Sequence, residues 1–245
     1  MMRRMMSFWL VLALVSLVVG CAGDGAVSED AFTPPPAMLD VMLQVDDVPG
    51  AEERMWLEHG VLLTGCTYAE MVLNSVVSSP REGLRNTTAE YRVGGTRVYE
   101  TLIMQMMEGS RGGRLRLIKD TMNSCDGTEI EPYYGTLQTS GGKKVEQFSV
   151  MPANDLPEAV AGFTSVVTAD DGAQVTIQRI FVPILTEGDK PGLLSLATIA
   201  EGGSPGSPSP MDLLDAALAR AGATIDTYVP EPVTAVEPEP TATSD

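Results

Sequence analysis

Two tight turns between strand-like segments constrain the fold of this chain most. Ala169-Asp170-Asp171-Gly172 separates two segments of the second half, and Gly94-Gly95 separates residues 89–93 from 96–106 in the first half. Asp-Gly and Gly-Gly turns join neighbouring antiparallel strands, so the sequence predicts an antiparallel sheet. The second half is rich in Val, Ile, Phe and Thr, which favour strands. Its expected strands are 145–151, 162–168, 173–185 and 193–200.

Three segments are expected to form helices. In 37–44, Met38, Leu39, Met42 and Leu43 recur at helical spacing. In 111–124, Leu115, Ile118 and Met122 mark a buried face that places Cys125 at the helix end. The third helix has the clearest signals: Ser209 as N-cap, Pro210 in the first turn, Asp212 three residues after the cap, and Gly222 at the stop. Residues 66–77 fit a helix or a strand, and we favour a helix.

These elements predict an α+β layered sandwich, with a mostly antiparallel central sheet covered by helices. The flanks differ in composition from this domain. Residues 22–36 are small, polar and acidic and end in three prolines, as in a spacer. Residues 230–245 repeat Pro-Glu without an apolar face and are expected to be disordered. The folded domain is therefore expected at 37–229.

The N-terminal segment is typical of a signal for export and lipid attachment. Arg3-Arg4 precede an apolar run, 7–20, which ends in a small residue directly before Cys21. The run is shorter than the roughly 20 apolar residues that a transmembrane helix needs. We expect residues 1–20 to be removed and Cys21 to carry the lipid that anchors the chain at the extracytoplasmic face of the cell membrane. The alternative is an ordinary secretory signal in which Cys21 falls at this position by chance.

Cys66 and Cys125 are the two cysteines that follow Cys21. In an exported chain such a pair is expected to form a disulfide. A zinc site would need four nitrogen or sulfur ligands, and His59 is the single histidine of the sequence. A redox-active pair usually has the Cys-x-x-Cys spacing, which these cysteines lack.

The charge of the chain argues against nucleic acid as a partner. The sequence has 33 acidic and 16 basic residues, and two of the basic residues, Arg3 and Arg4, lie in the signal. Binding to nucleic acid depends on Lys and Arg that neutralise phosphates, and an acidic chain repels them.

Catalytic and metal-binding hypotheses find little support in the sequence, so we expect no enzyme activity, cofactor or metal. Ser-His-Asp catalysis would have to use His59, which we interpret as a solvated residue. The acidic pairs Asp46-Asp47, Glu52-Glu53 and Asp170-Asp171 lie beside turn residues and are expected to face water. Met104, Met106 and Met107 could bind Cu(I), but their spacing favours core packing.

Several of these features together resemble the extracellular sensor domain of the mycobacterial serine/threonine kinase PknH and the actinobacterial lipoproteins that carry a similar domain. The matching features are the lipid signal, the LQVDDVP opening at 43–49, the Cys66 and Cys125 pair, the hairpin at Asp171-Gly172 and the DLLDAALAR helix at 212–220. The resemblance implies an αβ sandwich with a cleft for an extracellular ligand. The sensor domain of the kinase has two disulfides, whereas this chain can form one.

The sequence therefore leaves three functional hypotheses. The favoured one is a lipid-anchored extracytoplasmic sensor or ligand-binding domain for an unknown small molecule, with a cleft of mixed polar and apolar lining. The second is an envelope protein that binds another protein and has a closed core with an exposed apolar patch. The third, an envelope hydrolase, requires acid and base groups that converge in one pocket.

Overall fold

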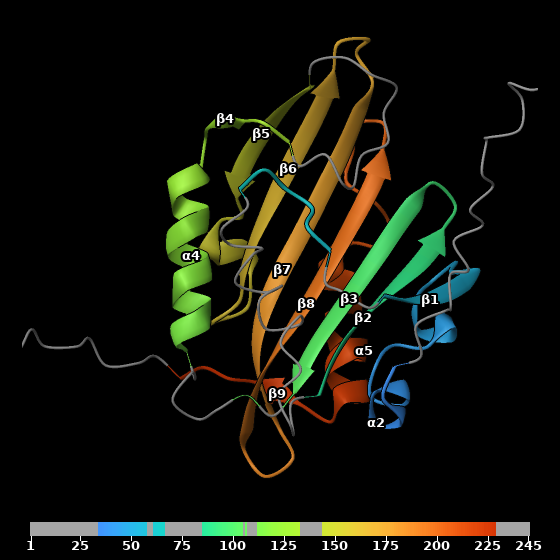
Figure 1. Cartoon of the computed structure of the whole chain (residues 1–245). Helices are drawn as coiled ribbons and strands as arrows, with labels where there is room; N and C mark the ends of the chain where they lie inside the picture. Colours follow the sequence, from blue (N-terminus) through green and yellow to red (C-terminus); the bar gives the residue numbers. More distant parts are fainter. Residues whose placement is uncertain are drawn as a thin grey trace, which may run out of the picture. The chain divides into compact units, whose positions relative to one another are not determined.

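The computed structural model describes residues 34–57, 61–66, 85–104, 106, 112–132 and 144–228. Cys21, His59 and most of the ambiguous segment 66–77 lie outside these residues. The described strands form one sheet in the order β1-β2-β3-β8-β7-β6-β5-β4, and β9 pairs with β7 (Figure 1). In chain order the strands are β1 (Glu53–Leu57), β2 (Arg85–Val93), β3 (Thr96–Met104), β4 (Glu129–Ile130), β5 (Lys144–Val150), β6 (Ala161–Ala169), β7 (Gln174–Thr186), β8 (Lys190–Glu201) and β9 (Thr224–Ile225).

Every pair of neighbouring strands among the described residues is antiparallel, which confirms the prediction of a mostly antiparallel sheet. The turns at Gly94-Gly95 and Asp171-Gly172 join β2 to β3 and β6 to β7 as expected. β3 pairs with β8, a strand from the other half of the chain. This pairing joins the two hairpin systems into one sheet, and the local sequence does not predict it.

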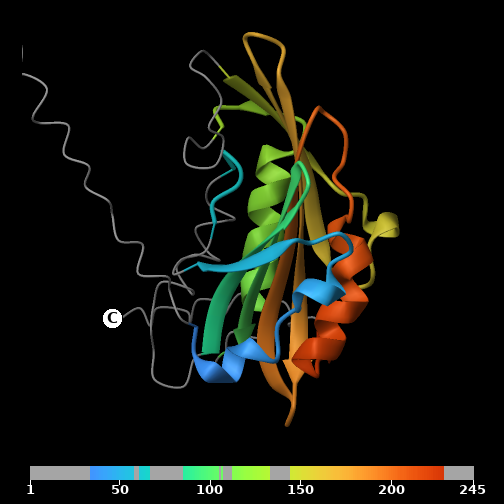
Figure 2. The ribbon, with the colours of Figure 1, turned by 90° about the vertical axis from the view of Figure 1, so that its right-hand side faces the viewer.

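The two long helices pack on different faces of the sheet. α4 (Gly113–Cys125) contacts β5, β6 and β7, and α5 (Pro210–Ala221) contacts β7 and β8. Figure 2 shows them on opposite sides of the strands. Side chains along β7 alternate between the two faces of the sheet, so β7 contributes to both cores. Ile177 and Phe181 face α4, whereas Ile180 and Val182 face α5. Each helix contacts only part of the sheet.

The termini of α5 follow the sequence signals closely. The Ser209 side chain accepts a hydrogen bond from the Asp212 N–H, and the Asp212 carboxylate accepts one from the Ser209 N–H. Pro210 occupies the first turn, and Gly222 ends the helix with a φ of 57°. α4 also confirms its prediction, since Leu115, Ile118 and Met122 are buried. Both helices were therefore predictable from local sequence.

The N-terminal prediction was wrong in its extent. Helix α2 covers only Pro36–Leu39, and a short 3-10 helix, η1, covers Val45–Asp47. Met42 and Leu43 are fully buried although they lie outside either helix. Their apolar spacing reflects packing onto the sheet, and a turn followed by η1 can present the same residues to it.

Candidate functional site

The connection between β5 and β6, residues 151–160, borders two adjoining grooves. It contains the short 3-10 helix η3 (Ala153–Asp155). The α4 groove has a volume of about 370 Å³, and the α5 groove has one of about 340 Å³. Both volumes lie within the range of small-molecule sites. The grooves share Val150, Met151, Pro152 and Leu156.

The α4 groove combines a polar helix face with an apolar wall. Lys119, Asn123 and Asp126 come from α4 and its C-terminal end, where spacings of three and four residues place them on one side. Asp126 is fixed because its Oδ1 accepts a hydrogen bond of 2.8 Å from the Val150 N–H. The remaining lining is mostly apolar: Met122, Val150, Met151, Pro152, Ala153, Leu156, Val160, Ala161 and Gly162. This is the mixed lining that the favoured functional hypothesis predicts.

The α5 groove lies beside the N-terminus of α5. Ser209, Pro210 and Met211 form one wall, and strands β5, β6 and β7 contribute Ser149, Thr164 and Gln178. The Oε1 atom of Gln178 is buried and has no hydrogen-bond partner. Asp155, Val150, Met151, Pro152 and Leu156 complete the lining.

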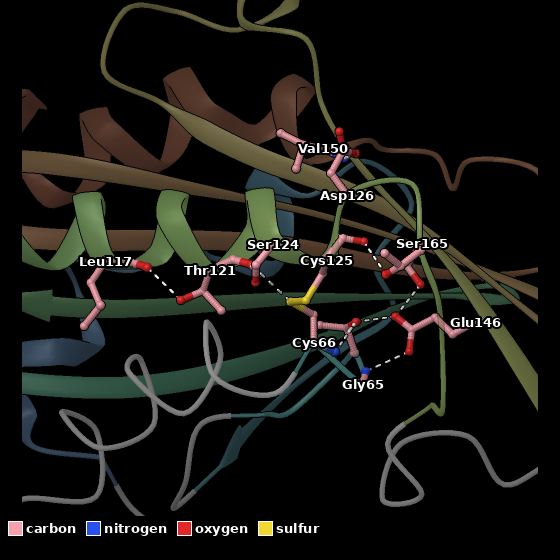
Figure 3. Close-up of a disulfide and its surroundings, with 12 residues drawn as sticks. Gly65, Cys66, Leu117, Thr121, Ser124, Cys125, Asp126, Glu146, Val150 and Ser165 are labelled. Atoms are coloured by element: carbon pink, nitrogen blue, oxygen red, sulfur yellow. Dashed lines mark hydrogen bonds between the residues drawn. A yellow bond between two sulfur atoms is a disulfide. The ribbon is translucent and has the colours of Figure 1, made fainter.

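The disulfide joins the segment 61–66 to the end of α4. The Cys66 and Cys125 sulfurs are 2.07 Å apart and close a sequence separation of 59 residues (Figure 3). Asp126, which holds Val150 at the α4 groove, directly follows Cys125. The bridge therefore fixes the helix end that supplies the polar wall of this groove.

A buried carboxyl group holds the segment 61–66 against β5. Glu146 is fully buried, and its side chain accepts hydrogen bonds from the Thr64 hydroxyl, the Gly65 N–H at 2.7 Å and the Ser165 hydroxyl at 2.6 Å (Figure 3). Burial raises the pKa of Glu146 above its ordinary value, and the three donors partly oppose this shift. Gly65 fits here because a Cβ at this position would overlap the Glu131 carbonyl.

Arg179 holds the start of the same segment from the centre of the sheet. Its side chain is 1% exposed and donates to the Ser195 Oγ at 2.8 Å and to the Val61 carbonyl at 3.1 Å. The guanidinium also lies over the Phe181 ring at 5.2 Å. Sequence reasoning did not identify Arg179 or Glu146, since each is a single charged residue within a strand-like pattern.

A second buried carboxyl group, Glu100 on β3, anchors the N-terminal segment. Its Oε2 accepts a hydrogen bond of 2.9 Å from the Leu43 N–H and lies 3.0 Å from the Tyr91 hydroxyl. The Tyr91 hydroxyl also donates a hydrogen bond of 2.7 Å to the Leu43 carbonyl. This carbonyl accepts a second hydrogen bond from Nη1 of Arg54. Burial raises the pKa of Glu100 to about 7. The hydrogen bonds that Glu100 accepts from Tyr91 and Leu43 partly oppose this shift, and its Oε1 atom is buried without a hydrogen-bond partner in the described part of the chain.

The acidic pairs are positioned differently from one another. Asp170 and Asp171 are exposed in the β6–β7 turn, as predicted. The prediction that Asp47 is simply solvated is corrected. Its carboxylate forms an ion pair of 2.6 Å with Arg220, and this pair is partly exposed. Glu53 belongs to β1, a strand that the sequence did not predict, and forms an ion pair with Arg92.

Met104, the last residue of β3, and Met106, which follows the strand, support core packing. Met104 belongs to the core on the α5 side of the sheet, whereas Met106 packs against the core on the α4 side. Two thioethers that pack against different cores do not form one copper site. Among the described residues no three His, Cys, Asp or Glu residues gather into a metal site. Met107 lies outside the described residues.

Comparisons with known proteins show a structural likeness. No protein-family model matches the chain, and no curated protein matches it. Among solved structures, the extracellular domain of PknH from Mycobacterium tuberculosis is similar, with a TM-score of 0.48 and 9% sequence identity. The alignment covers 76% of this chain and 98% of that domain. This level of similarity assigns the chain to no family, and the functional proposal therefore depends on the residues themselves.

The described part of the chain contains no helix long and apolar enough to cross a bilayer.

Proposed function

We propose that this chain is a lipid-anchored extracytoplasmic sensor or ligand-binding domain without catalytic activity. The observation that carries the proposal is the pair of adjoining grooves along 151–160, which combine apolar walls with a few fixed polar groups. The Cys66–Cys125 disulfide supports an oxidising compartment. The apolar run before Cys21 supports export and lipid attachment.

The alternative of a protein-binding envelope component receives less support. That hypothesis predicts a closed core with an exposed apolar patch. In the described residues the exposed large apolar side chains are Leu117 and Tyr228, at 39% and 48% exposure. Leu117 lies on α4 and Tyr228 follows β9, so they come from separate parts of the sequence. The grooves offer a more definite binding site than these two side chains.

Methionine methyl resonances test ligand binding, because methionines line the grooves. Met122 reports on the α4 groove, Met211 on the α5 groove and Met151 on both. The full chain, labelled with carbon-13 at its methionine methyls, is titrated with a mixture of uncharged fragments that each carry a hydroxyl or amide. We expect shifts at Met151 and at Met122 or Met211, and none at the buried Met38 and Met42 of the N-terminal segment.

A groove-filling substitution provides the control. Ala153 is exposed and lines the α4 groove, so Ala153→Trp should abolish fragment shifts at Met122. Ala173→Trp places the same side chain at an exposed position in the β6–β7 turn and should leave them unchanged. Fragments that shift no groove methionine, or that shift Met122 equally in both variants, would contradict the proposed site.

A further inference from the structure

The α5 groove contains a row of polar side chains that crosses four strands. Strand pairing aligns Ser149 with Thr164, Thr164 with Gln178, and Gln178 with Thr198. Directly paired residues lie on the same face of a sheet, so these side chains form one line across β5, β6, β7 and β8. Ser149, Thr164 and Gln178 line the groove itself.

The row contrasts with its surroundings on the same face. Further along β7 and β8 this face carries Ile180, Val182, Leu194 and Leu196, all fully buried against α5 and the N-terminal segment. The polar row is therefore confined to the end of the face where α5 begins. Packing against α5 does not require hydroxyl and amide groups there.

Two members of the row have buried polar atoms that no protein group satisfies. Gln178 Oε1 and Thr198 Oγ1 have no hydrogen-bond partner, and neither has Thr176 Oγ1, two residues before Gln178 on β7. Thr198 is 0% exposed and Thr176 is 2% exposed. A buried polar atom without a partner destabilises the folded protein. A ligand that hydrogen-bonds to Gln178 from the groove would remove part of this cost.

The charges around the groove disfavour an anionic ligand. Among the described residues that line the α5 groove, Asp155 is the only one with a charged side chain. The first turn of α5 already holds a carboxylate, because Asp212 accepts a hydrogen bond of 2.8 Å from the Ser209 N–H. A second anion at this helix end would be repelled. The apolar lining of Met151, Pro152, Leu156, Pro210 and Met211 likewise favours a ligand without a net charge.

We propose that the α5 groove binds a neutral ligand with several hydroxyl groups, of the saccharide class. This inference rests on the proposed function and specifies its ligand. Neighbouring strands lie about 4.8 Å apart, so Ser149, Thr164 and Gln178 present hydrogen-bonding groups at regular intervals along one line. Such a line suits a ligand that carries several hydroxyls, and the apolar wall contacts its ring carbons.

Methionine methyl spectra of the full chain test the ligand class. The probes are maltose, cellobiose and diacetylchitobiose, with a sugar phosphate as the anionic comparison. The protein is kept in a detergent that lacks a sugar headgroup. We expect at least one neutral disaccharide to shift Met211 and Met151 but not Met122, and the sugar phosphate to bind at least about tenfold more weakly.

Gln178→Met tests the polar row directly. We expect it to weaken sugar binding roughly tenfold, the effect of one lost hydrogen bond, and to leave the unfolding midpoint unchanged or higher. The control is Gln147→Met, the same change at an exposed position on β5 outside the groove, which should leave both quantities unchanged. Thr164→Val provides a second variant if Gln178→Met does not fold.

The outcomes separate this inference from the proposed function. If uncharged fragments shift the groove methionines but no disaccharide does, the saccharide class is wrong and the proposed function stands. If no probe shifts them, both are overturned. Equal sugar binding by the wild type and Gln178→Met would also overturn the inference.

Discussion

Removing the Cys66–Cys125 bridge is expected to lower the free energy of unfolding by about 4 kcal/mol. The bridge closes 59 residues, and a loop of this length restricts the unfolded chain by that amount in the chain-entropy treatment. Urea unfolding of the full chain and of the double variant Cys66→Ala/Cys125→Ala measures the difference. Alanine is used because Cys66 is 3% exposed and a serine would bury a hydroxyl there.

The single variants identify the source of this loss. Cys66→Ala and Cys125→Ala each break the bridge, so each is expected to lose nearly as much stability as the double variant. Reduction of the wild type should lower its stability by a similar amount. A loss below about 1 kcal/mol in the double variant would mean that the bridge does not stabilise the fold as its loop length predicts.

The second large effect concerns Glu100. Its pKa is about 7 in the folded protein, against 4.5 for an unperturbed glutamate side chain, so the folded state binds more protons between these values. Stability is therefore highest below the unfolded pKa and is lost as the pH rises through the folded pKa. The wild type is expected to lose about 3 kcal/mol from this group between about pH 4 and pH 8.

Glu100→Gln isolates this contribution. Glutamine keeps the shape and an acceptor oxygen for the Leu43 N–H but does not ionise. The stability difference between variant and wild type should therefore shift toward the variant by about 3 kcal/mol from about pH 4 to pH 8, measured by urea unfolding. Glu187→Gln, an exposed change in the β7–β8 turn, is the control. A pH-independent difference between Glu100→Gln and wild type would refute the burial argument.

Other carboxyl groups shape the remaining pH profile. The buried Glu146 has a raised pKa and contributes in the same direction as Glu100, and its contribution remains in Glu100→Gln. The pKa of Asp47 is lowered by its hydrogen bond to Arg220, and the pKa of Asp212 is lowered by the Ser209 N–H. Their stabilisation is present above the unfolded pKa and is lost as the pH falls through the folded pKa.

The parts of the fold that local chemistry determines were predictable from the sequence. The turns at Gly94-Gly95 and Asp171-Gly172, the caps of α5 and the buried face of α4 each follow from neighbouring residues. Cys125 at the end of α4 and its bridge to Cys66 also agree with the prediction. These signals identify elements but not their order in the sheet.

The rest depends on contacts between distant residues. The β3–β8 pairing brings residues about 100 positions apart together, and no turn signals it. The strand β1 depends on its pairing with β2, and the N-terminal turn around Leu43 depends on Tyr91 and Glu100, which lie far along the chain. The short strands β4 and β9 have two residues each and too little pattern to detect.

The candidate site was predicted only as a type of cleft. Its polar row depends on the register of β5 through β8, which places Ser149, Thr164, Gln178 and Thr198 side by side. In the sequence these residues are separate polar positions within four strand-like segments. A polar residue inside an apolar strand is the one available signal, and its role can be recognised only once the strand order is known.

The proposed function requires first that the chain is exported and tethered through Cys21, and intact mass tests this requirement most directly. The chain is expressed with its own signal in a bacterium that processes lipoproteins, and its mass is measured with and without reduction. We predict a mature chain that begins at Cys21, carries acyl mass and gains the mass of two hydrogens on reduction. An unacylated chain cut elsewhere, or one with free thiols at Cys66 and Cys125, would contradict the account.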